Sequence, residues 1–286
     1  MSRAAFLATT ALAVAALGLQ PTSSHAEHSW GNYHWRTTAN PVTLQLGDNV
    51  TATWDDYLGE ASTDWSVSEF LSTTVGEGMT SPRNCKPTDG RVEVCNASYG
   101  FNGWLGLAQI WVSGGHITKG IAKLNDTYFD TPTYDKQDWR DMVMCQEVGH
   151  TFGLGHQDEN FSNPDLKDTG GVETCMDYTS SPAYNGQPNG HDYEELGNIY
   201  DHDHGTSTVS RPGKGNGRGN GNAVAVTGFE FAAYVRDDPD DWGQAVAFTS
   251  KGQPLLFVKD LGEGEKRITH VLWTEDARAG RHFPHH

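Results

Sequence analysis

The stretch CQEVGHTFGLGHQD, residues 145–158, decides how this chain is interpreted. On a helix, positions 146 and 150 lie one turn apart on the same face, so Gln146 and His150 point the same way with Glu147 beside them. In zinc hydrolases such a face presents metal ligands, and an adjacent glutamate polarises the water that zinc activates. A Glu-x-x-His pair alone is common and usually structural, so the residues that follow carry the argument.

The second half of this stretch continues the pattern. Gly153 lets the chain leave the helix, because glycine tolerates positive φ, and His156 can then fold back towards the same metal. The spacing of Glu147, His150, Gly153 and His156 resembles that of the metzincin zinc endopeptidases. Their motif is H-E-x-x-H-x-x-G-x-x-H, followed by a turn that contains a methionine.

The resemblance extends to about residues 40–202. The segment Thr174-Cys175-Met176-Asp177-Tyr178 looks like the methionine turn. The family pattern implies that Met176 lies under the metal ligands as a packed thioether. Tyr178 matches the tyrosine that astacin-like and serralysin-like members place near the metal, where it would hydrogen-bond the tetrahedral oxyanion. Residues 105–125 resemble the edge-strand region of matrixin-like members, which implies that an extended substrate adds to the strand at 105–112.

Gln146 departs from the family motif, because it stands where the first histidine belongs. Its carbonyl oxygen is a harder and weaker donor to zinc than an imidazole. The resemblance therefore implies a zinc ion held by His150 and His156, with either Gln146 or a substitute as the third ligand, and a metal that a mild chelator strips easily. Glu147 would be the general base. No spacing favours any one of the candidate substitutes, which are His116, His191, His202 and His204.

Four cysteines allow three pairings, and an even number suggests two disulfides in an exported protein. Cys85 and Cys95 flank a turn-rich segment, so a local bridge between them is expected. That leaves Cys145 with Cys175. In a metzincin-like fold the methionine turn lies beneath the metal helix, which agrees with a bridge that staples the floor of the site to that helix.

Export is predicted by residues 1–26. Arg3 precedes an apolar run, and Ser24-His25-Ala26 is typical of a signal-peptidase site. This run is too short for a membrane span, so the mature protein is expected outside the cell or in a periplasm. With 20 Lys and Arg against 37 Asp and Glu, the formal charge is −17, which argues against nucleic acid as a partner.

The mature chain is predicted to contain a metzincin-like α+β domain over residues 27–204, a twisted mixed sheet with a metal-site helix and a methionine turn. Hydrophobic spacing predicts strands and helices in the order strand, helix, several strands and two helices. The expected strands are 41–46, 68–75, 91–95, 105–112 and 116–124, and the expected helices are 54–65, 142–154 and 192–200, the last with Asp192 as its N-cap.

Residues 205–222 are glycine-rich and are predicted to be a flexible linker. Residues 223–286 are predicted to be a small all-β module with strands at 229–235, 245–248, 255–258 and 268–273. Two sets of side chains in it are weak metal candidates. One set could bind Ca²⁺, although an exposed acidic loop is the simpler interpretation; it consists of Asp237, Asp238, Asp240 and Asp241. The other set would bind metal adventitiously and consists of the terminal histidines His282, His285 and His286.

These features together predict a secreted zinc endopeptidase that acts on protein or peptide substrates, in which Glu147 is catalytic. Two other classes stay open. One is a catalytically weak or inactive binding protein on the same fold, which the glutamine at 146 favours. The other is a structural or adhesion protein whose working part is the linker and the β module. The sequence does not define an oligomeric state.

Overall fold

A computed structural model describes residues 28–161, 163–210, 239–249 and 251–280. The predicted signal segment, most of the predicted linker and the predicted strand at 229–235 lie outside the described residues. None of the helices in the described ranges has the length and apolar character needed to cross a membrane.

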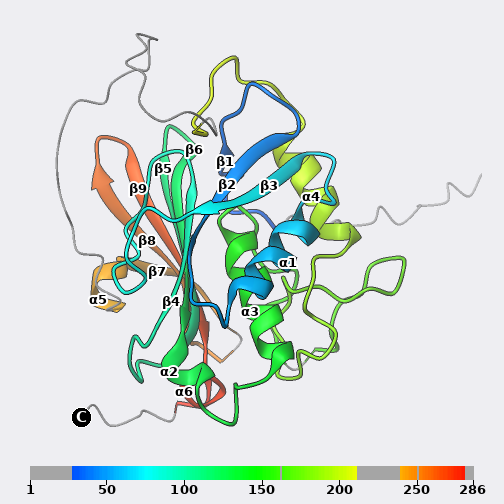
Figure 1. Cartoon of the computed structure of the whole chain (residues 1–286), viewed down its shortest axis with the longest axis vertical. Coiled ribbons are helices and arrows are strands. Elements are labelled where there is room, and N and C mark those ends of the chain that lie inside the picture. Colours follow the sequence, from blue (N-terminus) through cyan, green and yellow to red (C-terminus); the bar gives the residue numbers. More distant parts are fainter. Residues whose placement is uncertain (1–27, 162, 211–238, 250, 281–286) are drawn as a thin grey trace, which may run out of the picture.

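One twisted sheet forms the body of the described chain, with the longer helices on one side of it (Figure 1). The strand order is β3-β2-β4-β6-β5-β9-β8-β7, and β1 pairs with β6. The pairs among β3, β2, β4 and β6 are parallel, whereas β5 and the strands beyond it are antiparallel to their neighbours. The bounds are β1 His34–Trp35, β2 Val42–Asn49, β3 Leu71–Glu77, β4 Val92–Ala97, β5 Trp104–Ser113, β6 His116–Asn125, β7 Gln244–Phe248, β8 Pro254–Gly262 and β9 Glu265–Trp273.

Three longer helices pack on the sheet and on one another. These are α1 (Asp55–Trp65), α3 (Gln137–His150) and α4 (Gly190–Tyr200). The predicted helix at 142–154 is therefore present, but it begins earlier and ends at His150. The N-cap of α4 is Asn189, and Asp192 instead closes a capping box from the third helical position. Three single-turn helices complete the set: α2 (Asp126–Phe129), α5 (Pro239–Trp242) and α6 (Glu275–Arg278).

The C-terminal strands differ most from expectation. Strands are present where the sequence predicted them, but they continue the main sheet instead of forming a separate module: β9 pairs with β5 along most of its length. The physical reason is a shared core. Trp104 and Leu107 of β5 pack with Trp242, Phe257 and Val271 from the C-terminal segment, which buries apolar surface that neither part would cover alone.

This pairing also removes the free edge at which substrate was expected to add. Residues 105–112 lie on β5, which is bonded to β6 on one side and to β9 on the other. A strand with both ladders filled has no unpaired backbone groups for a peptide to bind. The expectation that substrate joins this strand is therefore wrong for the described structure.

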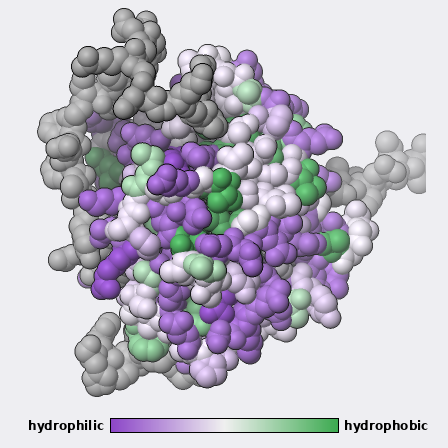
Figure 2. Space-filling view, in the orientation of Figure 1, coloured by the Kyte–Doolittle hydropathy of each residue, from purple (hydrophilic) through white to green (hydrophobic). Residues whose placement is uncertain are grey.

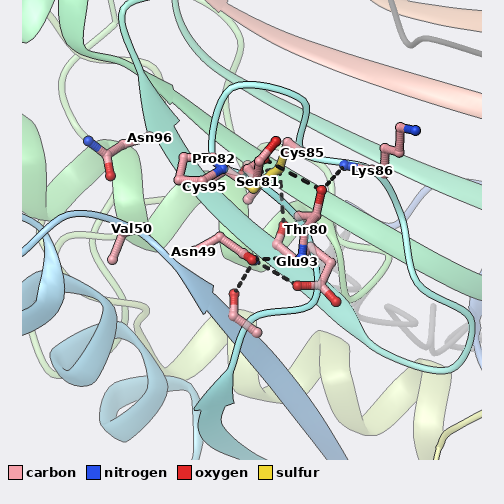
Figure 3. Close-up of a disulfide and its surroundings, with 12 residues drawn as sticks. Asn49, Val50, Thr80, Ser81, Pro82, Cys85, Lys86, Glu93, Cys95 and Asn96 are labelled. Carbon is pink, nitrogen blue, oxygen red and sulfur yellow. Dashed lines mark hydrogen bonds between the residues drawn. A yellow bond between two sulfur atoms is a disulfide. The ribbon is translucent and has the colours of Figure 1, made fainter.

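Both expected disulfides are present, Cys85–Cys95 and Cys145–Cys175. The first lies away from the metal motif and secures the loop between β3 and β4 (Figure 3). Around it, the amide nitrogen of Asn49 donates to Glu93 and its oxygen accepts from the backbone of Thr80. This bridge therefore belongs to a polar network that fixes the sheet edge rather than to the motif at 145–158.

The calcium interpretation is not supported. Asp241 is paired on both carboxylate oxygens, with Lys259 at 2.5 Å and with Arg267 at 3.2 Å, so two cations already neutralise it. Asp237 and Asp238 lie outside the described residues.

The surface is largely polar on the face shown in Figure 2. In the face shown in Figure 2, hydrophilic residues dominate and hydrophobic residues form only small separate patches between them.

Candidate metal centre

The end of α3 places the first two histidines as expected. His150 is the last residue of the helix, and the chain then turns through Gly153 at φ +98°. A side chain at Gly153 would also collide with the carbonyl oxygen of Tyr33, so only glycine fits this turn. His156 returns beside His150, with 3.2 Å between their Nε2 atoms.

A third imidazole completes the group, and it comes from β9. The ring of His270 lies 3.8 Å from that of His150 and 4.3 Å from that of His156, centre to centre. Side chains alternate along a strand, so His270 shares the helix-facing side of β9 with Ile268 and Leu272. One nitrogen from each of the three histidines lies within 4.8 Å of the others. We call this group the buried cluster.

Sequence reasoning missed His270 as a member of this group. It lies beyond the predicted linker in the run Ile268–Trp273, whose alternation indicates a strand core. A histidine in the middle of such an apolar run is the one local signal, because a buried imidazole requires a partner.

The buried cluster suits a metal ion of the zinc type. His150 donates from Nδ1 to the carbonyl of Leu154 at 2.8 Å, which leaves the lone pair of Nε2 towards His156. Both ring nitrogens of His270 and Nδ1 of His156 are buried without a hydrogen-bond partner. Burial lowers the pKa of His150 to about 3 and that of the other two well below the usual value, which favours the neutral imidazole, the form that can bind a metal, in all three.

Gln146 has a different neighbourhood from the one the motif implies. Its amide nitrogen donates to the carbonyls of Cys175 and Asp177, at 2.7 and 3.3 Å. These bonds tie α3 to the methionine turn. Its carbonyl oxygen is buried and accepts no hydrogen bond from the described residues.

Glu147 is fully buried and both of its carboxylate oxygens are without a hydrogen-bond partner. It lies against Gly106 of β5, where an added Cβ would collide with its carboxylate. Desolvation raises its pKa well above the usual value. Burial without a hydrogen-bond partner therefore makes this carboxylate a stronger base than an exposed one.

The methionine turn lies under the helix, as the resemblance implied. The sulfur of Met176 lies against Gly149, 2.7 Å from where a Cβ would stand. The Cys145–Cys175 bridge joins the two segments at the adjacent residues. Tyr178 packs its ring 3.9 Å from that of His156, and its hydroxyl lies 3.5 Å from the carbonyl of Val271, to which it donates.

The N-terminal segment closes one side of the buried cluster. Trp30 stacks on His150 at 5.1 Å and on His270 at 5.3 Å between ring centres. Its backbone nitrogen bonds the carbonyl of Gly153, so the segment is fixed to the turn after the helix. Trp30 therefore shields this side of the cluster from solvent.

A cavity of about 250 Å³ is lined by residues that include Phe161, Ser180 and Arg278. Phe161 lines it and stacks on Tyr178 at 4.4 Å, and Tyr178 in turn packs on His156. Arg278 and Lys251 contribute positive charge to its lining, and Glu275 contributes negative charge.

The four histidines considered as substitute ligands do not join the buried cluster. His191 packs on His28 at 4.9 Å. His116, His202 and His204 gather with His34 at a separate place.

Sequence comparison leaves the family open. No protein-family model matches the chain, and no curated protein sequence matches it.

Distant likenesses among solved structures include the following two. One is myroilysin, at 10% identity and a TM-score of 0.34, over 62% of this chain and 98% of that one. The other is high choriolytic enzyme 1, a hatching enzyme zinc-protease from the medaka fish Oryzias latipes, at 9% identity and a TM-score of 0.32, over 59% and 94%. At these identities and TM-scores neither likeness assigns a function to this chain.

Proposed function

We propose that this chain is a secreted zinc endopeptidase in which His150, His156 and His270 hold the metal. The observation that carries the proposal is the convergence of three neutral, buried imidazoles beside an unpartnered carboxyl group. Three histidines with one open position are typical of catalytic rather than structural zinc. The two disulfides agree with the export that residues 1–26 predict.

When bound, zinc would supply Lewis acidity that polarises the scissile carbonyl and activates water. Glu147 would take the proton of the attacking water and pass it to the leaving nitrogen. Its buried position favours this exchange, because a carboxyl group with a raised pKa is a stronger base and holds the proton until the amine departs. We propose that Tyr178, whose hydroxyl has only a long hydrogen bond, turns to donate to the oxyanion.

We propose that the substrate approaches from the cavity beside Phe161, since β9 occupies the edge of β5. The aromatic stack of Phe161 and Tyr178 connects this cavity to His156. Residues on the C-terminal segment then belong to the catalytic unit, together with the domain predicted over 27–204.

The test is peptide hydrolysis by the purified zinc-loaded protein and by Glu147→Gln. Casein or gelatin digestion is expected to fall by about 10²–10⁴-fold in Glu147→Gln, with zinc content unchanged, because only the proton exchange is lost. Tyr178→Phe is expected to lower kcat and to leave the fold intact. Equal digestion by the parent and Glu147→Gln would remove Glu147 from the mechanism.

A second function is favoured by the enclosure of the site. All three histidines are at most 7% exposed, and the strand edge beside them is filled. These facts agree with a secreted metal-binding protein that has the fold but not the activity. Full zinc occupancy without hydrolysis of casein, gelatin or a random peptide library would establish this alternative over the endopeptidase.

A further inference from the structure

A second group of histidines lies apart from the buried cluster. His34 belongs to β1, His202 and His204 follow the end of α4, and His116 begins β6. The pairing of β1 with β6 sets His34 directly opposite His116. We call the three residues His34, His202 and His204 the surface cluster, and His116 packs alongside them at 4.6 Å from His204.

The backbone holds the surface cluster in place without a metal. The nitrogen of His204 donates to the carbonyl of Thr37 at 3.2 Å, and that of Thr208 donates to Arg36 at 2.9 Å. The segment after α4 therefore runs beside the segment after β1. Since His202 and His204 are two residues apart on this segment, both rings can face His34.

The nitrogen geometry is that of a metal site. Nε2 of His34 lies 2.7 Å from Nε2 of His204 and 3.2 Å from Nε2 of His202. Tetrahedral zinc, with Zn–N bonds of about 2.0–2.1 Å, sets its ligand nitrogens about 3.3 Å apart. Small side-chain rotations would bring the three nitrogens to that spacing.

The hydrogen bonds outside the cluster direct lone pairs into it. Nδ1 of His34 donates to the carbonyl of Asn32 at 2.6 Å, so the neutral ring keeps its lone pair on Nε2. An imidazole held by a backbone carbonyl through one nitrogen is the usual arrangement of a metal ligand. Two nitrogens 2.7 Å apart must share either a proton or a cation.

We propose that the surface cluster is a second binding site for a divalent transition metal, with Zn²⁺ as its ion. Imidazole ligands select zinc, copper and nickel over calcium and magnesium. The ion would join β1 to the segment after α4, and binding energy at such a clamp stabilises the folded state. His116 is the fourth imidazole within reach.

One neighbouring charge opposes the ion. Arg36 lies 3.2 Å from Nδ1 of His116. Its guanidinium can only donate, so Nδ1 of His116 either accepts from Arg36 or donates to the carbonyl of Gly114 at 3.0 Å, and only the second arrangement leaves a lone pair on Nε2 for a metal. We therefore expect Arg36→Gln to tighten metal at the surface cluster.

The test counts zinc ions per chain. All proteins carry His282→Ser, His285→Ser and His286→Ser, so that the terminal histidines contribute nothing. Parent, His202→Ala/His204→Ala and His150→Ala/His156→Ala are dialysed against buffered zinc and analysed by elemental mass spectrometry. His191→Ala, which alters a histidine outside both clusters, is the control.

We expect two zinc ions in the parent and in the control, and one in each double variant. Zinc should also raise the Tm of His150→Ala/His156→Ala, but not after His202→Ala/His204→Ala is added to it. Two ions in His202→Ala/His204→Ala would overturn the proposal. So would a parent with one ion that only His150→Ala/His156→Ala removes.

The two proposals fail separately. A single ion lost only in His202→Ala/His204→Ala would support the surface site and refute the endopeptidase. If His150→Ala/His156→Ala does not fold, His34→Gln in the parent provides the same count, and retention of both ions by that variant would again overturn the surface site.

Discussion

The buried and surface clusters are built from the same parts but in different surroundings. In each, one histidine donates from Nδ1 to a backbone carbonyl and turns Nε2 towards a second histidine. The buried cluster adds the unpartnered carboxyl of Glu147, and none of its histidines is more than 7% exposed. The surface cluster has an exposed member, His202, and an arginine nearby.

This comparison shows what separates a candidate catalytic site from a candidate clamp. Three imidazoles bind a metal in either place. Among the described residues, the buried cluster has Glu147 three positions before His150, a fully buried carboxyl group without a hydrogen-bond partner, and charged groups act far more strongly in such surroundings. The side chains around the histidines, and not the histidines themselves, therefore distinguish a candidate catalytic site from a candidate structural one.

The largest expected effect separates His270 from Gln146. His270→Ala removes an imidazole from the buried cluster, and its zinc affinity should fall by more than about 100-fold, with loss of hydrolysis. Gln146→Ala removes two hydrogen bonds to the methionine turn and should cost about 1–3 kcal/mol of unfolding free energy while zinc stays bound. Competitive zinc titration of both, in the His202→Ala/His204→Ala background, makes the comparison.

The reverse result would restore the ligand set that the motif implies. If Gln146→Ala loses zinc and His270→Ala keeps it, the amide oxygen is the ligand and β9 only covers the site. The same titration tests chelation: a set with Gln146 predicts zinc that a mild chelator strips easily, whereas three imidazoles predict zinc that resists it.

The next largest effect is expected from removing the disulfides, because the Cys145–Cys175 bridge lies beside the buried cluster and the Cys85–Cys95 bridge does not. Cys145→Ala/Cys175→Ala removes the disulfide between residues 30 positions apart and should lower the unfolding free energy by about 4 kcal/mol. It should also weaken zinc binding at the buried cluster. Cys85→Ala/Cys95→Ala removes the disulfide between residues 10 positions apart and should lower the unfolding free energy by about 3 kcal/mol, with zinc binding unaffected. Urea unfolding and zinc titration measure the two quantities; equal loss of zinc in both variants would contradict the assignment.

The sequence predicted the parts of the buried cluster that are local. His150 and His156 are joined by a single helix end and one glycine turn, so their approach follows from short-range geometry. His270 could not be predicted, because its place depends on the pairing of β9 with β5, and pairing partners far apart in the chain leave no spacing signal.

The surface cluster likewise could not be predicted from the spacing of residues in the sequence. His202 and His204 are among the candidate substitutes for the third ligand of the motif, but they lie with His34 and apart from His150 and His156. Their partner His34 lies in a strand of two residues that the sequence did not indicate. The C-terminal strands were predicted one by one, yet their shared core with Trp104 came only from the three-dimensional packing.

The smallest effect concerns the pH dependence of stability. The methionine turn beside the buried cluster contains a titratable group, whereas the surface cluster is held by backbone hydrogen bonds that do not titrate. Asp177 in the methionine turn is 2% exposed, and its carboxylate accepts from the nitrogen of Leu166 at 2.8 Å. Burial raises its pKa from 3.8 to about 7, and the nearby carboxylates of Asp158 and Asp165 act in the same direction. Between these two values the folded protein holds a proton that the unfolded chain has released. Stability therefore falls as pH rises through this window and is level above about 7.

Asp177→Asn keeps an acceptor for Leu166 without the charge, so its stability relative to the parent should increase from pH 4 to pH 7 and then stay constant. Urea unfolding of the metal-free proteins across this range measures the difference. Asp203→Asn, an exposed change beside the surface cluster, is the control and should shift stability by less than about 0.5 kcal/mol. A difference between Asp177→Asn and the parent that does not change with pH would show that Asp177 is ionised in the fold, and the methionine turn would then support the buried cluster equally well in acid and at neutrality.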